Sequence, residues 1–134
     1  MTVVTTSRKP VPEVRSLARD LAFAVDAEYR TRGKAGMGEL FALDGPVVIV
    51  SRSGPIFLIQ VFSNEVSVAE ILIKSFSVTE RPGVLARGLF VSDRSVYEAL
   101  KDHLNVLFAG EALPERRIVF DGTQRKRYTL KVTG

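Results

Sequence analysis

A pair of cations stands directly before a predicted helix near the N-terminus. Arg8 and Lys9 precede Pro12, and proline is favoured as the first residue of a helix. The helix dipole disfavours positive charge at this end by roughly 0.3–1 kcal/mol per residue, so stability alone does not account for the pair. A helix start with free N–H groups and flanking cations suits a phosphate, and Arg15 and Arg19 extend the basic stripe along the helix. The segment therefore predicts contact with a phosphate group. The alternative is that these cations are simply exposed to solvent and bind no ligand.

A second candidate is the loop that begins at Arg30, in which Arg30, Arg32 and Lys34 alternate with small residues and glycines. Glycine lets a backbone approach a ligand closely, and interleaved cations suit a sugar–phosphate chain. The loop is not a nucleotide-binding P-loop, because Ala35 rather than Ser or Thr follows Lys34. An ordinary charged turn is the alternative reading.

A third candidate lies near the C-terminus, where Arg125, Lys126 and Arg127 precede Tyr128 and residues 116–117 add two more arginines. Consecutive cations beside an aromatic ring can pair with phosphates and stack on a base. We expect Tyr128 to pack on the sheet instead, so the hypothesis depends on the cations. Charge that protects an exposed edge strand is the competing explanation.

The charge distribution agrees with a polyanionic partner. The chain has 134 residues and a net charge of +4, but residues 1–36 carry seven Lys or Arg against four acids, and residues 116–134 carry six against one. Cations held near phosphates gain Coulomb energy and release counterions. The chain has no cysteine, which excludes disulfides and thiolate chemistry and fits a cytoplasmic protein. No apolar run approaches the length of a membrane helix, so no membrane contact is expected.

Catalysis has little support in the sequence. His103 is the single histidine and is expected on a helix, partly exposed. Asp20, Asp26 and Glu28 read as helix-surface and loop charges, and no cluster has metal-ligand spacing. We therefore expect neither an enzyme nor a cofactor, a metal or a small-molecule substrate.

Hydrophobic periodicity and turn residues predict the elements in chain order. A helix over 93–108 is inferred from apolar spacing and from Ser95 and Glu98, which stand at capping-box spacing. Residues 66–76 look strand-like, although 67–74 could also form a helix. The other expected elements are strands over 3–6, 28–30, 47–51, 56–62, 85–92, 117–120 and 128–132, helices over 12–26 and 39–42, and a turn over 79–83.

The strand–helix unit at the start of the chain has a weak echo in its second part. Val3 to Ser7 leads into the helix at Pro12, and Leu89 to Ser92 leads into the helix at Asp93, each with Ser at the strand end and Arg close behind. The order of elements predicts one α/β domain over 1–134, with a mixed sheet and helices. Two similar halves are compatible with the echo.

The N-terminal motifs resemble a known family. Val4-Thr5-Thr6-Ser7-Arg8-Lys9-Pro10, the helical Arg15-Ser16-Leu17-Ala18-Arg19-Asp20-Leu21 and the loop Arg32-Gly33-Lys34 resemble the opening signature of the Brix-domain family, and its small archaeal members in particular. The specific part covers about the first 38 residues. Thr31 departs from the pattern, because the family usually has Asn there.

The resemblance implies an α/β fold of two similar halves, akin to the anticodon-binding domains of class II aminoacyl-tRNA synthetases. It also implies a non-catalytic role in ribosome biogenesis through binding of ribosomal RNA or its precursor, with guide RNA and ribosome-assembly proteins as further candidate partners. Two alternatives stay open: a protein-interaction adaptor within a preribosomal particle, and a detached tRNA anticodon-binding module. The predicted RNA-binding residues are Arg8, Lys9, Arg15, Arg19, Arg30, Arg32, Lys34, Arg125, Lys126 and Arg127.

Overall fold

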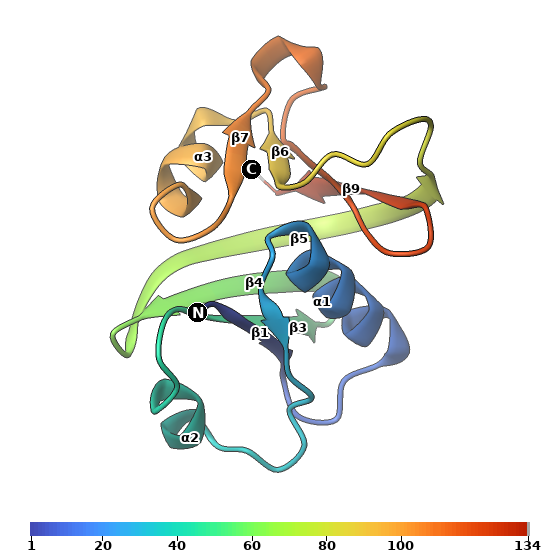
Figure 1. Ribbon diagram of the computed structural model, residues 1–134. Helices are drawn as coiled ribbons and strands as arrows, with labels where there is room; N and C mark the ends of the chain where they lie inside the picture. The colour runs from blue at the N-terminus through green and yellow to red at the C-terminus, as the bar shows by residue number, and fades with distance from the viewer. Residues whose placement is uncertain (134) are drawn as a thin grey trace.

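One long strand joins the two halves of a mixed nine-stranded sheet, as the computed structural model of the chain shows (Figure 1). The structure describes residues 1–133. Across the sheet the strand order is β2-β1-β3-β4-β5-β9-β8-β6-β7. In chain order the elements are β1 (Val3–Thr6), α1 (Pro12–Ala24), β2 (Glu28–Tyr29), α2 (Met37–Phe41), β3 (Val47–Ser53), β4 (Ile56–Ser63), β5 (Val66–Glu80), β6 (Leu89–Val91), α3 (Arg94–Leu100), β7 (Val106–Phe108), the 3-10 turn η1 (Gly110–Ala112), β8 (Arg117–Asp121) and β9 (Lys126–Val132).

The two outer parts of the sheet are built alike. The unit β1–α1–β2 and the unit β6–α3–β7 each consist of two parallel strands joined by a helix, and they occupy the two ends of the sheet. The strand pairings in between make β1 and β6 run in opposite directions, so the loops after these two strands lie at opposite ends of the molecule. The predicted mixed α/β sheet with two similar halves is confirmed. The inner strands break the likeness, because β3 is parallel to β1 whereas β8 is antiparallel to β6.

The helices α1 and α3 share one hydrophobic core on the same face of the sheet. Val14, Leu17 and Leu21 form the buried stripe of α1, at the three- and four-residue spacing that the sequence shows, and α3 adds Val96 and Leu100 to the same cluster. On the other face, α2 places Leu40 against Val47 and Ile49 of β3 in a second, smaller cluster. None of the helices in residues 1–133 is long and apolar enough to cross a membrane.

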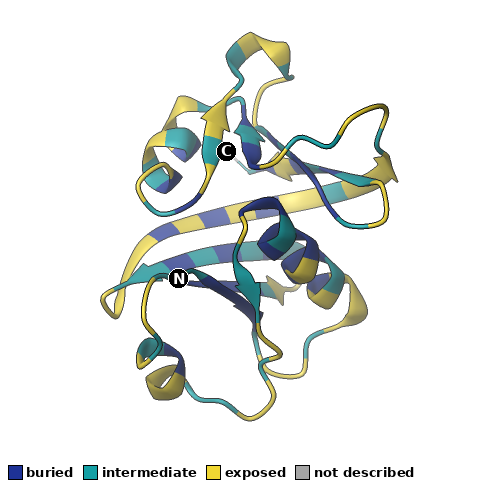
Figure 2. Cartoon of the chain, in the orientation of Figure 1, coloured by how far each residue is buried: buried dark blue, intermediate teal, exposed yellow. Residues whose placement is uncertain are grey.

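The segment that could be strand or helix from the sequence is the 15-residue strand β5. Its first part alternates between buried Ala69, Ile71 and Ile73 and exposed neighbours, as Figure 2 shows by its blue and yellow bands. β4 pairs with this first part and β9 with the second, which carries β5 on to Glu80. The turn predicted over 79–83 therefore begins two residues later, at Arg81.

The predicted helix over 93–108 is wrong in its second half. α3 ends at Leu100, and Val106–Phe108 form β7 as a parallel partner of β6. β-branched and aromatic side chains favour a strand here, and the leucine spacing concealed it. The capping box is also wrong, since the N-cap is Asp93 and Glu98 pairs with Arg94 and Lys101.

Two smaller corrections follow from the same region. His103 lies in the turn after α3 rather than on a helix. The strand predicted over 85–92 covers only Leu89–Val91, because the segment before it forms a loop. In that loop the backbone N–H of Ala86 donates to Asp121 Oδ2 at 3.0 Å, so this part of the chain is held by a side chain instead of a strand partner.

Candidate nucleic-acid interface

The loops after β1 and β2 bring four of the predicted cations together. β1 and β2 are parallel neighbours, so their carboxyl ends meet at the same edge of the sheet. Arg8 and Lys9 follow β1, and Arg32 and Lys34 lie in the loop after β2 (Figure 1). Arg8 Nη2 donates to the carbonyl oxygen of Lys34 at 3.3 Å. The two basic segments that the sequence predicts separately therefore form one cluster, which we call the β1–β2 cation cluster.

Arg32 holds this cluster in place. Its Nη1 donates to Thr6 O at 3.0 Å and its Nε to Ala35 O at 2.7 Å, so the side chain links the end of β1 to the loop after β2. Partial burial and the nearby positive charge of Arg8 lower the pKa of Arg32. Two guanidinium groups that repel each other in this way gain from an anion placed between them. Arg32 thus has a structural role as well as a charge.

A small hollow of about 330 Å³ lies beside the cluster, between Ser7–Val11 and the β3–β4 turn. Arg52, near the end of β3, lines it together with Arg8 and Lys9. Arg52 is not among the candidate residues that the sequence predicts. The signal was weak, because nothing in the sequence says that this turn folds back beside the start of α1. Arg52 is 3.6 Å from Glu13, an exposed pair that contributes little.

The start of α1 offers fewer free N–H groups than the sequence suggested. The N-cap Val11 makes no side-chain cap, Pro12 has no N–H, and the N–H groups of Val14 and Arg15 both donate to Val11 O. Glu13 also places a carboxylate in the first turn. Contact with a phosphate at this end of the helix therefore depends on side-chain cations.

Arg15 and Arg19 are exposed on α1, one turn apart. Arg19 directly precedes Asp20, whose side chain accepts hydrogen bonds from Thr123 in the β8–β9 turn, so Arg19 lies near this turn. The exposed side of α1 therefore leads from the β1–β2 cation cluster toward the third predicted basic segment. Arg125, exposed in the β8–β9 turn, continues this path.

Asp20 fixes the β8–β9 turn against α1, and reading it as a surface charge was wrong. The side chain is 2% exposed. Its Oδ1 accepts bonds from Thr123 N at 3.0 Å and Thr123 Oγ1 at 2.7 Å, and its Oδ2 accepts one from the Tyr128 hydroxyl. The sequence did contain a sign of this burial, because Asp20 stands three residues after Leu17 and four before Ala24, at the spacing of the buried face of α1. Tyr128 is buried and stacked on another ring of the sheet, so its predicted packing on the sheet is confirmed.

Two of the predicted RNA-binding cations are engaged in ion pairs. Arg30 Nη2 lies 2.7 Å from Glu28 Oε2, and Arg127 Nε lies 2.8 Å from Asp121 Oδ1. Lys126 is half-buried. Of the three consecutive C-terminal cations, Arg125 is therefore the most available to a ligand. The RNA-binding role of all ten residues stays a prediction.

The carboxyl group of Asp121 is buried among cations. Burial alone raises its pKa, but the bond from Arg127, the N–H of Ala86 and the charge of Arg81 outweigh burial and hold the pKa below its usual value. The Arg127–Asp121 pair therefore contributes to stability in a pH-dependent way.

Asp121→Asn is expected to make folding less sensitive to acid. The contribution of a carboxyl whose pKa is lowered in the folded chain is complete above its unfolded pKa of 3.8 and is lost as the pH falls through the folded value. Urea unfolding of the wild type should show a steeper loss of stability below about pH 4 than the variant shows. At pH 7 the variant should be less stable by about 2 kcal/mol, because Arg127 loses its partner. If the free energy of unfolding fell equally with pH in the wild type and in Asp121→Asn, the result would contradict a stabilising role of the ionised carboxylate.

Comparison with known proteins identifies the fold. No protein-family model matches the sequence, and no curated protein matches it. Solved structures match over nearly the whole chain, including the following two. Mil, an archaeal Imp4-like protein, is 21% identical with a TM-score of 0.68, and the match covers 100% of this chain and 97% of Mil. A probable ribosomal biogenesis protein from Aeropyrum pernix K1 is 22% identical with a TM-score of 0.68, and the match covers 98% of this chain and 94% of that protein.

The chain thus has the two-half α/β fold of an Imp4-like protein. The α/β fold that the resemblance of the N-terminal motifs implies is therefore confirmed. The further likeness to anticodon-binding domains of class II aminoacyl-tRNA synthetases stays a prediction.

Proposed function

We propose that this chain is a non-catalytic ribosome biogenesis factor of the Brix family that binds ribosomal RNA or its precursor. The similar structures support the biological setting, since one is described as a probable ribosomal biogenesis protein and the other as Imp4-like. The N-terminal motifs support the family, because they coincide with the segments that form the β1–β2 cation cluster.

The observation that carries the proposal is the convergence of cations that have no ion-pair partner among residues 1–133. Arg8, Lys9 and Lys34 have no ion-pair partner among residues 1–133, and Arg8 approaches the backbone of the loop that contains Lys34. Arg15 and Arg19 extend the cluster along α1 and are separated by a rise of about 6 Å along the helix axis. Cations in such an array hold a sugar–phosphate backbone and position it without reading the sequence.

The expected mechanism is selection of an RNA conformer. A protein that binds one RNA conformation more tightly than another shifts the population toward it, and no covalent step is needed. The positions of the cations along the loops and α1 would determine which backbone paths fit.

A salt titration tests this proposal. Fluorescence anisotropy with a labelled single-stranded fragment of ribosomal RNA should show affinity that falls with salt, with a log–log slope of about −0.7 for each phosphate held. With three to five phosphates held by the cluster and α1, the slope should be about −2 to −3.5. Binding that does not depend on salt, or no binding at low salt, would rule the proposal out.

The same assay separates ribosomal RNA from transfer RNA. A detached anticodon-binding module should bind a folded tRNA more tightly than the ribosomal fragment at equal salt. The proposed function predicts the opposite order.

A further inference from the structure

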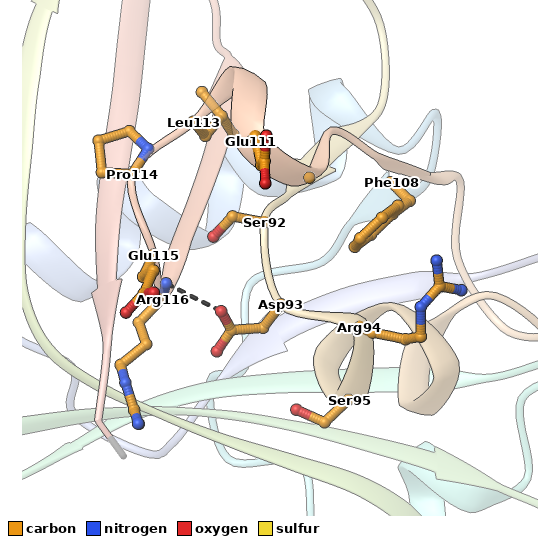
Figure 3. A pocket seen from close by; sticks show the side chains of 11 residues that line it. Ser92, Asp93, Arg94, Ser95, Phe108, Glu111, Leu113, Pro114, Glu115 and Arg116 are labelled. Carbon is orange, nitrogen blue, oxygen red and sulfur yellow. Dashed lines mark hydrogen bonds between the residues drawn. The ribbon is translucent and has the colours of Figure 1, made fainter.

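A hollow in the second half of the fold lies in the position that corresponds to the β1–β2 cation cluster in the first half. It has a volume of about 750 Å³ and is formed by the loops that follow β6 and β7 (Figure 3). Since β1 and β6 run in opposite directions, the hollow and the cation cluster lie at opposite ends of the sheet. The hollow and the β1–β2 cation cluster occupy equivalent places in the two halves, but the side chains of the hollow are apolar and acidic.

One wall of the hollow is apolar. Phe108, at the end of β7, keeps 40% of its surface exposed although it is a large aromatic residue. The guanidinium of Arg94 lies 4.4 Å from the centre of the Phe108 ring and also 3.8 Å from Glu98, so Arg94 already has partners. Leu113 lines the wall formed by the β7–β8 connection. An apolar side chain of a ligand can therefore pack here.

The remaining wall is acidic on balance, because it carries the carboxylates of Asp93, Glu111 and Glu115 against the single cation Arg116. Glu111 and Glu115 line the hollow and have no ion-pair partner among residues 1–133. Asp93 Oδ1 accepts a bond from the backbone N–H of Arg116 at 2.9 Å, which orients the carboxylate but does not neutralise it (Figure 3). Carboxylates gathered on a chain of net charge +4 favour a cationic ligand and repel phosphates.

The hollow continues into a groove that suits an extended ligand. A second hollow of about 360 Å³ shares Asp93, Ser95 and Arg116 with the first and runs along α3 to Val132 of β9. The two hollows together form an elongated groove, so an extended ligand can place successive side chains in them.

We propose that this groove binds an extended segment of a protein partner in which lysine or arginine residues alternate with apolar residues. The acidic wall selects the cations, and Phe108 and Leu113 receive the apolar side chains. The protein segment and the RNA would then occupy opposite ends of one sheet, which goes beyond the proposed RNA-binding function.

A titration followed by NMR tests the site with a defined probe. A short peptide that alternates lysine and leucine is added to the ¹⁵N-labelled chain, and a peptide with glutamate in place of lysine serves as the control ligand. Shifts are expected with the lysine peptide only, at the residues that line the two hollows: 70–72, 92–96, 99, 108, 110–111, 113–116 and 132–133. No binding, or shifts confined to other residues, would overturn the proposal.

Charge reversal shows whether the acidic wall selects the ligand. Glu111→Lys with Glu115→Lys should weaken binding of the lysine peptide by about tenfold or more, because two attractive contacts become repulsive. Glu39→Lys with Glu65→Lys changes the net charge equally at exposed positions elsewhere and should leave affinity within about twofold. Equal weakening by both pairs would show that overall charge drives binding and would overturn the site. No RNA is present, so the result is independent of the proposed function.

Discussion

Replacing Asp20 with alanine is expected to lower the free energy of unfolding by about 4 kcal/mol. The substitution removes the acceptor of the Thr123 N–H, the Thr123 hydroxyl and the Tyr128 hydroxyl. Each buried donor that loses its partner costs about 1–3 kcal/mol, and the tyrosine hydroxyl is shielded from water. In a chain of this size the thermal midpoint should fall by roughly 15 °C. Urea unfolding followed by circular dichroism measures the change.

Two further variants make the result specific. Asp44→Ala removes an exposed carboxylate and should change stability by less than about 0.5 kcal/mol. Asp20→Asn keeps one acceptor for Thr123, so its cost should fall between those of the wild type and Asp20→Ala. An Asp20→Ala protein as stable as Asp44→Ala would show that the contact between α1 and the β8–β9 turn contributes nothing to the fold.

Removing three cations from the β1–β2 cation cluster is expected to weaken RNA binding by about 100-fold. Arg8→Ala, Lys9→Ala and Lys34→Ala together delete three charges, and each phosphate contact is taken as about 1 kcal/mol. Arg32 stays intact, because its bonds to Thr6 and Ala35 hold the loop and its loss would confuse folding with binding. Anisotropy at a single low salt concentration measures the loss, and circular dichroism confirms that the triple variant folds.

A matched triple variant controls for net charge. Lys74→Ala, Lys101→Ala and Lys131→Ala also delete three exposed cations, but from β5, the turn after α3 and β9. Their loss should weaken binding by no more than about fivefold, through long-range charge alone. Comparable losses in the two triple variants would mean that RNA responds to total charge and not to the cluster.

The sequence predicted the elements whose patterns are local. α1 follows from the spacing of Val14, Leu17 and Leu21, because a helix repeats its buried face within a few residues. β7 was missed for a related reason: its partner β6 lies 17 residues earlier along the chain, and the leucines around it also fit a helix. A parallel strand pair leaves no local signal of this kind.

The candidate site was predictable in composition but not in arrangement. Arg8 and Lys34 are 26 residues apart and meet only because β1 and β2 are parallel neighbours. The pairing of Arg127 with Asp121 depends on the register of β8 and β9, which sets these two residues opposite each other. Asp20 was misread because its partners lie more than 100 residues away, although its position on the buried stripe of α1 was a usable warning.

The most direct test of the central claim is the difference in salt dependence between the two triple variants. If the β1–β2 cation cluster holds the RNA backbone, the Arg8, Lys9 and Lys34 variant should have a log–log slope that is shallower than the wild-type slope by about 2, with about 0.7 lost per contact. The Lys74, Lys101 and Lys131 variant should keep the wild-type slope. A cluster variant whose slope equals that of the wild type would contradict the claim, because it would show that none of the three side chains holds a phosphate.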